Sequence, residues 1–486
     1  MSKRLCSIVS IVAASLLATA AHAVAASVPP PGPVPPPDNQ NLAHDIFRDI
    51  VEVHSVHDVG TKGVADIIAK YLIAGGFAPG DVKIIPETLY PEQVNVVVRL
   101  HGKKKGTPVM WICHMDVVEA KAADWTVPPF KFTEKDGYFY GRGTSDMKDE
   151  DAAVAASLIR LKKEGFVPDR DIIVAFTADE EVGQEQSGPA FLIKEHRDLI
   201  DAGLVINPDG GSGEIENGKR LAFGVETSQK TYVTFRLDVT NKGGHSSEPR
   251  PDNAIYQLAA GLVKFSHYQF PITLNATTRL YFRHMAALQT GQKRADMLAV
   301  AADKPDMKAA ERLTRDVPLN AILHSTCVAT MLNAGVQENA LPSDAQATIQ
   351  CRIMPTETPR GTRQAIVKAI DDPDIKVSQL GTVVSAPESP PSPELMESVA
   401  KVVHSMWSGV PVIPEMSAGA SDAIFTRNAG MPTYGIGGGW NDIHDIRMHG
   451  RDERHEIHDF YSTVEFTYRL MRQLSEANPD GASPRG

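Results

Sequence analysis

The sequence predicts an α/β protein with a central sheet flanked by helices and a second, inserted α+β domain. Apolar runs of strand length, such as VNVVVRL at 94–100 and DIIVAFT at 171–177, alternate with helical stretches, which is typical of a sheet covered on both faces. Near Tyr232 the pattern changes to TYVTFRLDV, whose alternation indicates a half-exposed strand of a different sheet. The chain has 486 residues, 42% of them hydrophobic and 22% charged, so it is long enough for two domains and too apolar for wholesale disorder.

The first 26 residues have the pattern of a secretory signal peptide. Lys3 and Arg4 precede an apolar run at 8–21, and small residues follow, so we expect cleavage after Ala23 or Ala26. The run is shorter than the roughly 20 residues that span a bilayer. We therefore expect a periplasmic or secreted protein with no stable membrane insertion after cleavage.

A proline-rich linker is predicted at 27–40, because VPPPGPVPPPD favours an extended polyproline spacer. The first part of the catalytic domain is predicted at 41–230. Its expected elements are helices at 41–53, 63–74 and 149–164, and strands at 94–100, from 108, at 171–177 and at 203–207.

The inserted domain is predicted at 231–385, with a helix-like, polar stretch at 265–315 and an alternating strand, ATIQCRI, at 347–353. The proline cluster APESPPSP at 386–393 marks the return to the first domain. The second part of the catalytic domain is predicted at 386–478, and it closes with a helix at 461–474 before a polar tail at 479–486.

Charge and cysteine content exclude several classes of protein. The net charge of -11 argues against nucleic acid as a partner, because that partner requires a basic face. No CxxC occurs, so neither a thiolate zinc site nor a disulfide framework is indicated. Cys113 is expected to be a small buried strand residue, and pairing of Cys327 with Cys351 is left open.

Side chains that bind metals follow the ends of several predicted strands. Imidazole and carboxylate together suit zinc or another borderline divalent ion, and two ions need about five or six ligands with one carboxylate between them. Two adjacent glutamates cannot face one ion equally, so one is expected to be a ligand and the other a general base. The candidates are His114, Asp116, Asp146, Glu180, Glu181, Asp209 and His449.

Four segments around these residues carry a specific resemblance. HMDVV, DWTVPPF, DGYFYGRGTSDMKDE and FTADEEVG resemble the signature of the co-catalytic zinc metallopeptidase and deacylase family, which includes aminoacylase, acetylornithine deacetylase, succinyl-diaminopimelate desuccinylase, glutamate carboxypeptidase and carnosine dipeptidase. The resemblance covers residues 41–474. It implies a zinc-exopeptidase-like catalytic domain with a central mixed sheet, an inserted lid or dimerisation domain, and a homodimer.

The resemblance also implies a set of metal ligands. His114 and Asp209 would bind one ion, Glu181 and His449 would bind a second, and Asp146 would bridge them. The cofactors expected are two divalent metal ions, with zinc first and cobalt or manganese as alternatives.

Further roles near the metals follow from the same resemblance. Asp116 would fix the imidazole tautomer of His114 by a hydrogen bond, and Glu180 would be the general base. The peptide bond between Asp146 and Met147 is expected to be cis.

The inserted domain contributes candidates of its own. His245 in NKGGHSSEP resembles the family histidine that stabilises the oxyanion, often from the partner subunit, although a surface histidine in a glycine turn would look the same. Asn339 and Arg352 match substrate-contacting positions, and a structural ion pair is the alternative for Arg352. Gly419 and the glycines at 437–439 are expected to let the backbone approach substrate, or to form ordinary turns.

Other histidines compete with His449 as the last ligand. His455 and His458 are three residues apart, so they do not form an HExxH motif, and His444 is a weaker competitor. His449 is favoured because Glu453 gives it the HxxxE setting of the family. No GxSxG occurs either.

The sequence predicts a zinc-dependent exopeptidase that hydrolyses dipeptides or short peptides. Asp209 favours this function, because peptidases of the family tend to have aspartate there and deacylases tend to have glutamate. The alternative is an N-acyl amino acid amidohydrolase, similar to aminoacylase or a carboxypeptidase, with the same two ions. A periplasmic solute-binding protein would need neither Glu180 and Glu181 nor metals.

Overall fold

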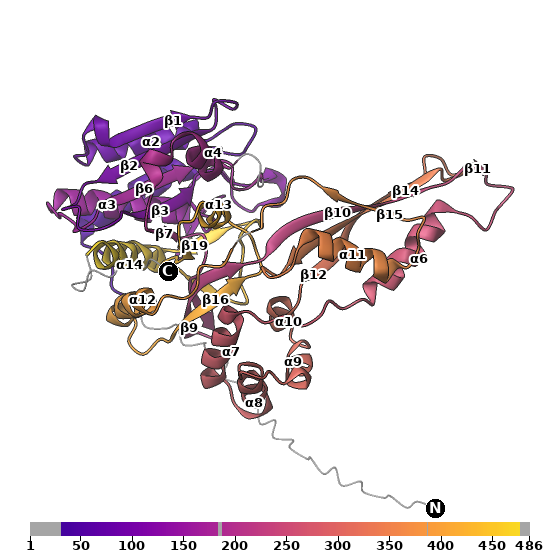
Figure 1. The fold of residues 1–486 in the computed structure, drawn as a ribbon. Coiled ribbons are helices and arrows are strands. Elements are labelled where there is room, and N and C mark those ends of the chain that lie inside the picture. Colours follow the sequence, from indigo (N-terminus) through magenta and orange to yellow (C-terminus); the bar gives the residue numbers. More distant parts are fainter. Residues whose placement is uncertain (1–30, 183–186, 386, 477–486) are drawn as a thin grey trace, which may run out of the picture.

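The computed structural model describes residues 31–182, 187–385 and 387–476 (Figure 1). The predicted signal peptide at 1–26, the first part of the linker and the tail at 479–486 lie outside these residues. Within the described residues, no helix is both long enough and apolar enough to cross a membrane.

Two separated parts of the chain form the compact body of the molecule. The first part holds α1 (Pro37–Val51), α2 (Lys62–Ala74), β1 (Val82–Pro86), β2 (Val94–Leu100), β3 (Val109–His114), β4 (Thr133–Lys135), β5 (Tyr138–Tyr140), α3 (Lys148–Lys163), β6 (Ile172–Thr177), α4 (Gly188–Glu195), α5 (Arg197–Ile200), β7 (Leu204–Asn207), β8 (Gly213–Glu216) and β9 (Lys219–Gln229). The second part holds α12 (Pro393–Met406), β16 (Val412–Ser417), α13 (Ala423–Asn428), β17 (Thr433–Gly435), β18 (Trp440–Asp442), β19 (Arg454–Glu456) and α14 (Ile457–Ser475).

A ten-stranded mixed sheet organises the body, in the order β1-β2-β6-β3-β7-β17-β9-β8-β18, with β16 also paired to β9. Strands β6, β3, β7 and β17 run parallel to one another. Every residue of β3 and β6 is buried, as expected for strands covered on both faces. The predicted fold class is therefore confirmed.

Alternate residues of each central strand pack against different helices. Trp111 and Val174 lie in the core formed with α1, α2, α3, α12 and α14. Met110 and Ile173 lie in a second core with residues of α4 and α5. The sheet is thus sandwiched between two helical layers, and polar side chains are left at the ends of its strands.

The first helix begins earlier than the sequence predicted. α1 starts at Pro37, inside the linker predicted at 27–40. Proline has no backbone N–H to lose in the first helical turn and has a φ suited to it, and Asp38 favours the same end. The proline-rich segment also contacts the body, since Gly32 and Pro35 are buried and a Cβ on Gly32 would collide with Trp407.

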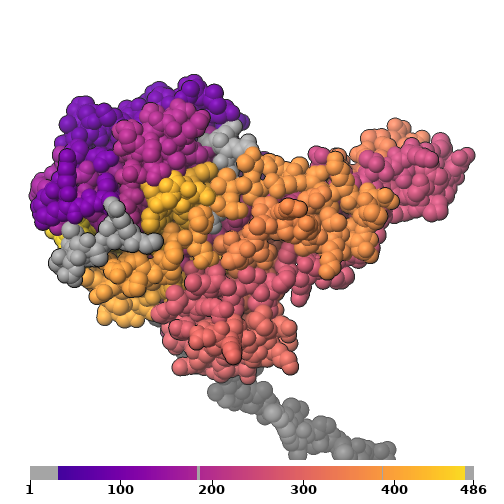
Figure 2. Space-filling model, viewed as in Figure 1, coloured from indigo at the N-terminus to yellow at the C-terminus, as the bar shows by residue number. Residues whose placement is uncertain are grey.

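Beyond Lys230 the chain leaves the large sheet and forms an arm that projects from the body (Figures 1 and 2). The arm sheet has the order β12-β14-β10-β15, and α6 and α11 contribute to its core. The elements of the arm are β10 (Thr231–Thr240), β11 (Gly244–His245), α6 (Ala254–Ser266), β12 (Thr326–Ala334), β13 (Ala340–Leu341), β14 (Asp344–Ile353), α11 (Pro359–Ile370) and β15 (Lys376–Leu380).

Residues 231–385 fold in two parts, although they were predicted as one inserted domain. Helices α7 (Ala276–Leu288), α8 (Gly291–Val300), α9 (Met307–Leu313) and α10 (Val317–Leu323) form their own core with Ala222 of β9 and Ile413 of β16. These helices therefore pack on the body, because their apolar residues meet the body sheet rather than the arm sheet.

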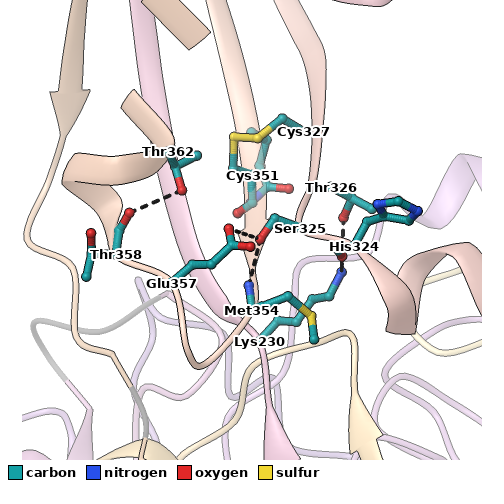
Figure 3. The surroundings of a disulfide bond; sticks show 11 residues. Lys230, His324, Ser325, Thr326, Cys327, Cys351, Met354, Glu357, Thr358 and Thr362 are labelled. Carbon is teal, nitrogen blue, oxygen red and sulfur yellow. Dashed lines mark hydrogen bonds between the residues drawn. A yellow bond between two sulfur atoms is a disulfide. The ribbon is translucent and has the colours of Figure 1, made fainter. Parts of the chain in front are cut away.

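A disulfide links two strands of the arm (Figure 3). Cys327 of β12 and Cys351 of β14 face each other in the antiparallel register, with their Cα atoms 4.1 Å apart. Beside the disulfide, Ser325 donates to Glu357 at 2.6 Å and accepts from the backbone N of Met354 at 2.8 Å. The pairing left open by the sequence is formed, and Cys113 is buried and free as expected.

The disulfide is expected to stabilise the arm more than the body. A Cys327→Ser/Cys351→Ser variant should lower the free energy of unfolding of the arm by about 2–4 kcal/mol, because the cross-link restricts the unfolded chain. All four tryptophans (Trp111, Trp125, Trp407 and Trp440) lie outside the arm. In a urea titration, circular dichroism should therefore show an earlier transition while tryptophan fluorescence keeps its midpoint. Unchanged midpoints in both signals would contradict the expectation. Wild-type protein with its disulfide reduced is the matched control.

Candidate metal centre and substrate cavity

The candidate metal ligands lie at one edge of the body sheet. The parallel strands β3, β6 and β7 end at the same edge, where polar residues of α/β proteins gather. His114 ends β3, Glu180 and Glu181 follow β6, and Asp209 follows β7.

Asp146 lies between two imidazoles. One carboxylate oxygen is 3.2 Å from Nε2 of His114, and the other is 2.9 Å from Nε2 of His449. Asp146 lies just before α3, and its peptide bond with Met147 is cis, as the resemblance implied. The geometry places this carboxylate at the centre of the site.

Two groups of three potential ligands share Asp146. The first is His114, Asp146 and Asp209, and the second is Asp146, Glu181 and His449, with the ligand atoms of each group within 4.8 Å of one another. His114, Glu180 and Glu181 form a third group of this kind. The structure thus brings together all five side chains named as metal ligands, with Glu180 beside them.

The site concentrates negative charge away from water. Burial, followed by the charge of Asp209, raises the pKa of Glu180 well above its usual range, and burial with the charge of Asp146 does the same for Asp209. Burial also opposes ionisation of Asp146, but hydrogen bonds from His114 and His449 prevail and hold its pKa below its usual value. Carboxylates crowded in this way around two imidazoles suit divalent cations, which would neutralise the charge.

His449 is the histidine that faces the site. Its Nε2 atom lies 3.0 Å from Glu181, and hydrogen bonds to Asp146 and Glu181 raise its pKa to about 10. The competitors point elsewhere. His455 lies between Asp149 at 2.7 Å and Asp459 at 3.1 Å.

Glu453 supports the loop that leads to Asp146. It is fully buried, and it accepts hydrogen bonds from the guanidinium of Arg142 at 2.5 Å and from the backbone N of Ser145 at 2.8 Å. The HxxxE spacing identified Glu453, but no pattern in the sequence indicated Arg142 as its partner.

Asp116 makes different contacts from those expected. Its backbone carbonyl, rather than its carboxylate, lies within hydrogen-bonding distance of Nδ1 of His114, at 3.0 Å against 3.7 Å. The carboxylate instead accepts from the backbone N atoms of Glu180 at 3.1 Å and Glu181 at 3.0 Å. The side chain of Asp116 therefore holds the segment that carries both glutamates.

A cavity of about 810 Å³ lies between the body and the arm, and Glu180, Glu181 and His449 contribute to its wall. From the arm, Arg352 and Tyr232 also line it, with the guanidinium 4.7 Å from the centre of the tyrosine ring. No ion pair holds Arg352 among the described residues, so the structural alternative is not favoured. The apolar part of the wall consists of Val182, Val233, Leu380, Val383, Ala420, Ile424 and Phe425.

Two other predicted residues lie far from the metal ligands of this chain. His245 is exposed on β11, which pairs with β13, and Asn339 directly precedes β13. Both lie at the tip of the arm, away from β3 and β7 (Figure 1). Within one chain the structure does not bring them to the metal centre.

The predicted glycines do not line the cavity. Gly419 donates its N–H to Ser417 at 2.9 Å, and its neighbours Ala420 and Ser421 are the ones that line the cavity. A side chain at Gly437 or Gly438 would collide with the carbonyl of Pro208 or with Thr463. Gly437 and Gly438 therefore allow close packing within the body.

Two functional candidates were missed in the sequence. Asp422, a cavity residue, accepts hydrogen bonds from the hydroxyls of Ser187 at 2.5 Å and Thr177 at 3.3 Å. His57 also lines the cavity, and its Nδ1 atom lies 3.0 Å from Asp179. No local pattern could indicate the contact of His57 with Asp179, because 122 positions separate them in the sequence.

The sequence matches a family model and several characterised proteins. Residues 110–473 match the model of peptidase family M20/M25/M40. The chain is 28% identical to N-fatty-acyl-amino acid synthase/hydrolase of Xenopus tropicalis over 380 residues, which are 76% of this chain and 73% of that protein. It is 23% identical to carboxypeptidase S of Saccharomyces cerevisiae, over 76% of this chain and 72% of that protein.

Solved structures share the fold. An M20 family metallo-carboxypeptidase from Sulfolobus solfataricus superposes with a TM-score of 0.67 and 15% identity, covering 89% of this chain and 99% of that one. Human carnosine dipeptidase 1 gives a TM-score of 0.64 and 13% identity, covering 91% and 100%. The chain belongs to peptidase family M20/M25/M40 and is a hydrolase of peptide or amide bonds.

Proposed function

We propose that the chain is a two-metal hydrolase of N-acyl amino acids, cleaving the amide bond next to a free carboxylate. The observation that carries this proposal is the pairing of Arg352 with Tyr232 in a cavity whose wall combines the candidate metal ligands with apolar residues such as Leu380, Val383 and Phe425. A guanidinium binds a carboxylate through two hydrogen bonds, and an apolar wall suits an acyl chain. The name of the Xenopus relative, which acts on N-fatty-acyl amino acids, supports the same substrate class.

The ligand groups suggest how two ions would be held. His114 and Asp209 would hold one ion, Glu181 and His449 the other, and Asp146 both. Zinc suits this mixture of imidazole and carboxylate, with cobalt or manganese as alternatives. When bound, the ions would acidify a water molecule and polarise the carbonyl of the substrate.

The remaining chemistry belongs to side chains of this chain. Glu180 would take the proton of the attacking water and return it to the leaving amine. Asp116 would keep Glu180 in place through its backbone N. Arg352 would orient the substrate by its carboxylate, and the cavity walls from body and arm would exclude bulk water.

Hydrolysis of free dipeptides is the second candidate function. Asp209, where deacylases of this type tend to have glutamate, favours it. A screen of N-acyl amino acids, N-acetylated dipeptides and free dipeptides, with zinc, cobalt or manganese and a chelator control, separates the two. Preference for N-acyl amino acids supports the proposal, and cleavage of free-amine peptides alone supports the dipeptidase.

A homodimer through the arm is proposed as well. β12 is an edge strand whose Val328, Met331 and Leu332 are 59%, 69% and 68% exposed. Tyr256 and Val263 of the neighbouring α6 are 70% and 60% exposed. Pairing of two such edge strands, one from each chain, would cover these apolar side chains. It would also let the arm tip of one chain approach the metal site of the other chain. There, His245 would stabilise the oxyanion.

We propose that the protein is exported from the cytoplasm. The leader pattern at 1–26 favours a periplasmic or secreted protein. The disulfide between Cys327 and Cys351 is also typical of an oxidising compartment.

Glu180→Gln should lower kcat by roughly 10²–10⁴-fold while both ions stay bound, because the amide cannot carry the proton. Steady-state kinetics and elemental analysis of the same sample measure the two effects. Glu92→Gln, on the surface, is the matched control. Near-wild-type turnover at full metal content would remove Glu180 from the role of base.

Arg352→Met should lower kcat/KM by roughly 10–100-fold for substrates with a free carboxylate, the loss typical of a charged hydrogen bond. Arg352→Lys should recover only part of it, since lysine cannot bind in bidentate fashion. The same kinetics on carboxamide-capped substrates provide the comparison. An equal loss on capped and free substrates would contradict carboxylate recognition.

Met331→Glu combined with Val263→Glu should convert the dimer to a monomer, because buried charges without partners oppose association. Sedimentation velocity at micromolar concentration measures the mass, and activity should fall with it. Val317→Glu, at an exposed apolar position of α10, is the control. A fully active wild-type monomer would reject both the dimer and the donation of His245.

A further inference from the structure

The half-buried side chain of His57 and the buried side chain of Asp179 form a pair that is not among the candidate metal ligands. Asp179 immediately precedes Glu180, and its side chain is fully buried. Its Oδ1 atom lies 3.0 Å from Nδ1 of His57, whereas its Oδ2 atom has no hydrogen-bond partner among the described residues. The imidazole of His57 is therefore the group that compensates this buried carboxylate.

The backbone of Asp179 forms a sharp turn. Its φ is +59°, in the left-handed region that aspartate adopts more readily than most residues other than glycine. The contact with His57 is thus placed where the chain turns from β6 into the segment that carries both glutamates.

His57 is itself well anchored. It lies in the loop between α1 and α2, where Gln93 donates a hydrogen bond to its backbone carbonyl at 2.8 Å. Its ring is one-third exposed and lines the substrate cavity. Nδ1 of the ring lies next to the carboxylate of Asp179. Nε2, on the other edge of the ring, takes no part in that contact.

Residues 179–181 are consequently held at two points. The carboxylate of Asp116 accepts from the backbone N atoms of Glu180 and Glu181, and His57 holds the side chain of Asp179. The first contact is made to the backbone of the segment, and the second to the side chain of Asp179. Because Asp116 and His57 are different side chains on different loops, a substitution of His57 removes only the second contact directly.

We propose that His57, acting through Asp179, is a positioning residue that sets the orientation of Glu180 and Glu181. His57 binds neither metal nor substrate in this role. The proposal deepens the function proposed above and rests on it, since Glu180 is taken as the base and Glu181 as a ligand.

Three substitutions of His57 separate positioning from substrate contact. His57→Ala removes both ring nitrogens and should lower kcat by roughly 10–100-fold with KM within about twofold, as is typical when a partner of a metal-site residue is removed. His57→Asn keeps an N–H donor near the place of Nδ1 and should restore most of kcat. His57→Gln places its donor nearer to Nε2 and should stay low.

A second readout requires no turnover. In the metal-free protein, hydrogen exchange followed by mass spectrometry should show faster exchange for a peptide covering 177–182 in His57→Ala, and near-wild-type exchange in His57→Asn. A zinc titration should show weaker binding of one of the two ions, by roughly tenfold or more. His54→Asn is the matched control, since His54 lies on the same loop, pairs with Glu119 at 3.3 Å and does not line the cavity.

The outcomes distinguish this inference from the function on which it rests. A wild-type protein without metal-dependent hydrolysis would reject the proposed function, and the exchange data would still decide the role of His57. Wild-type exchange, zinc binding and kcat in His57→Ala would overturn the inference. A change confined to KM, rescued by His57→Gln, would overturn it in favour of a substrate contact.

Discussion

The architecture depends on keeping several carboxylates close together at one edge of the body sheet. Asp116, Asp146, Glu180, Glu181 and Asp209 gather there, and burial disfavours the charge of each of the last four. Two imidazoles offset part of this charge, and divalent cations would offset the rest. A chain that folds around such a cluster must hold each carboxylate by other contacts, because their mutual repulsion would otherwise separate them.

Those contacts come from parts of the chain that are distant in sequence. Glu453 and Arg142 fix the loop before Asp146, and Asp116 fixes the backbone of both glutamates. His455, between Asp149 and Asp459, joins the start of α3 to the start of α14. Side chains from both parts of the interrupted domain therefore support the charge cluster.

The arm supplies what the body lacks. The body provides acids and imidazoles, whereas the arm provides Arg352 and Tyr232 at the opposite wall of the cavity. Arg352 follows directly after Cys351, so the disulfide lies next to the residue proposed to bind the carboxylate. Under the proposed function, this division would place the chemistry on the body and substrate selection on the arm. Helices α7–α10 lie between α6 and β12 in the sequence, yet they pack on the body.

Local patterns in the sequence were enough to predict the fold class, strands β2, β3, β6 and β7 of the body, and the gathering of candidate ligands at the ends of strands. Strands β3, β6 and β7 are continuous apolar runs that a buried parallel sheet requires, and the residues that follow such strands meet at one edge. The family resemblance added the pairing of those residues with Asp146 and His449.

Only the tertiary structure decided which residues support the candidate metal ligands. The carboxylate of Asp116 binds backbone N–H groups rather than His114, and His57 meets Asp179 across 122 positions. The placement of α7–α10 on the body and of His245 at the tip of the arm was equally beyond local patterns. A periodic pattern indicates which face of a helix or strand is buried. It does not indicate which residues that face contacts, because those contacts depend on the packing of the whole chain.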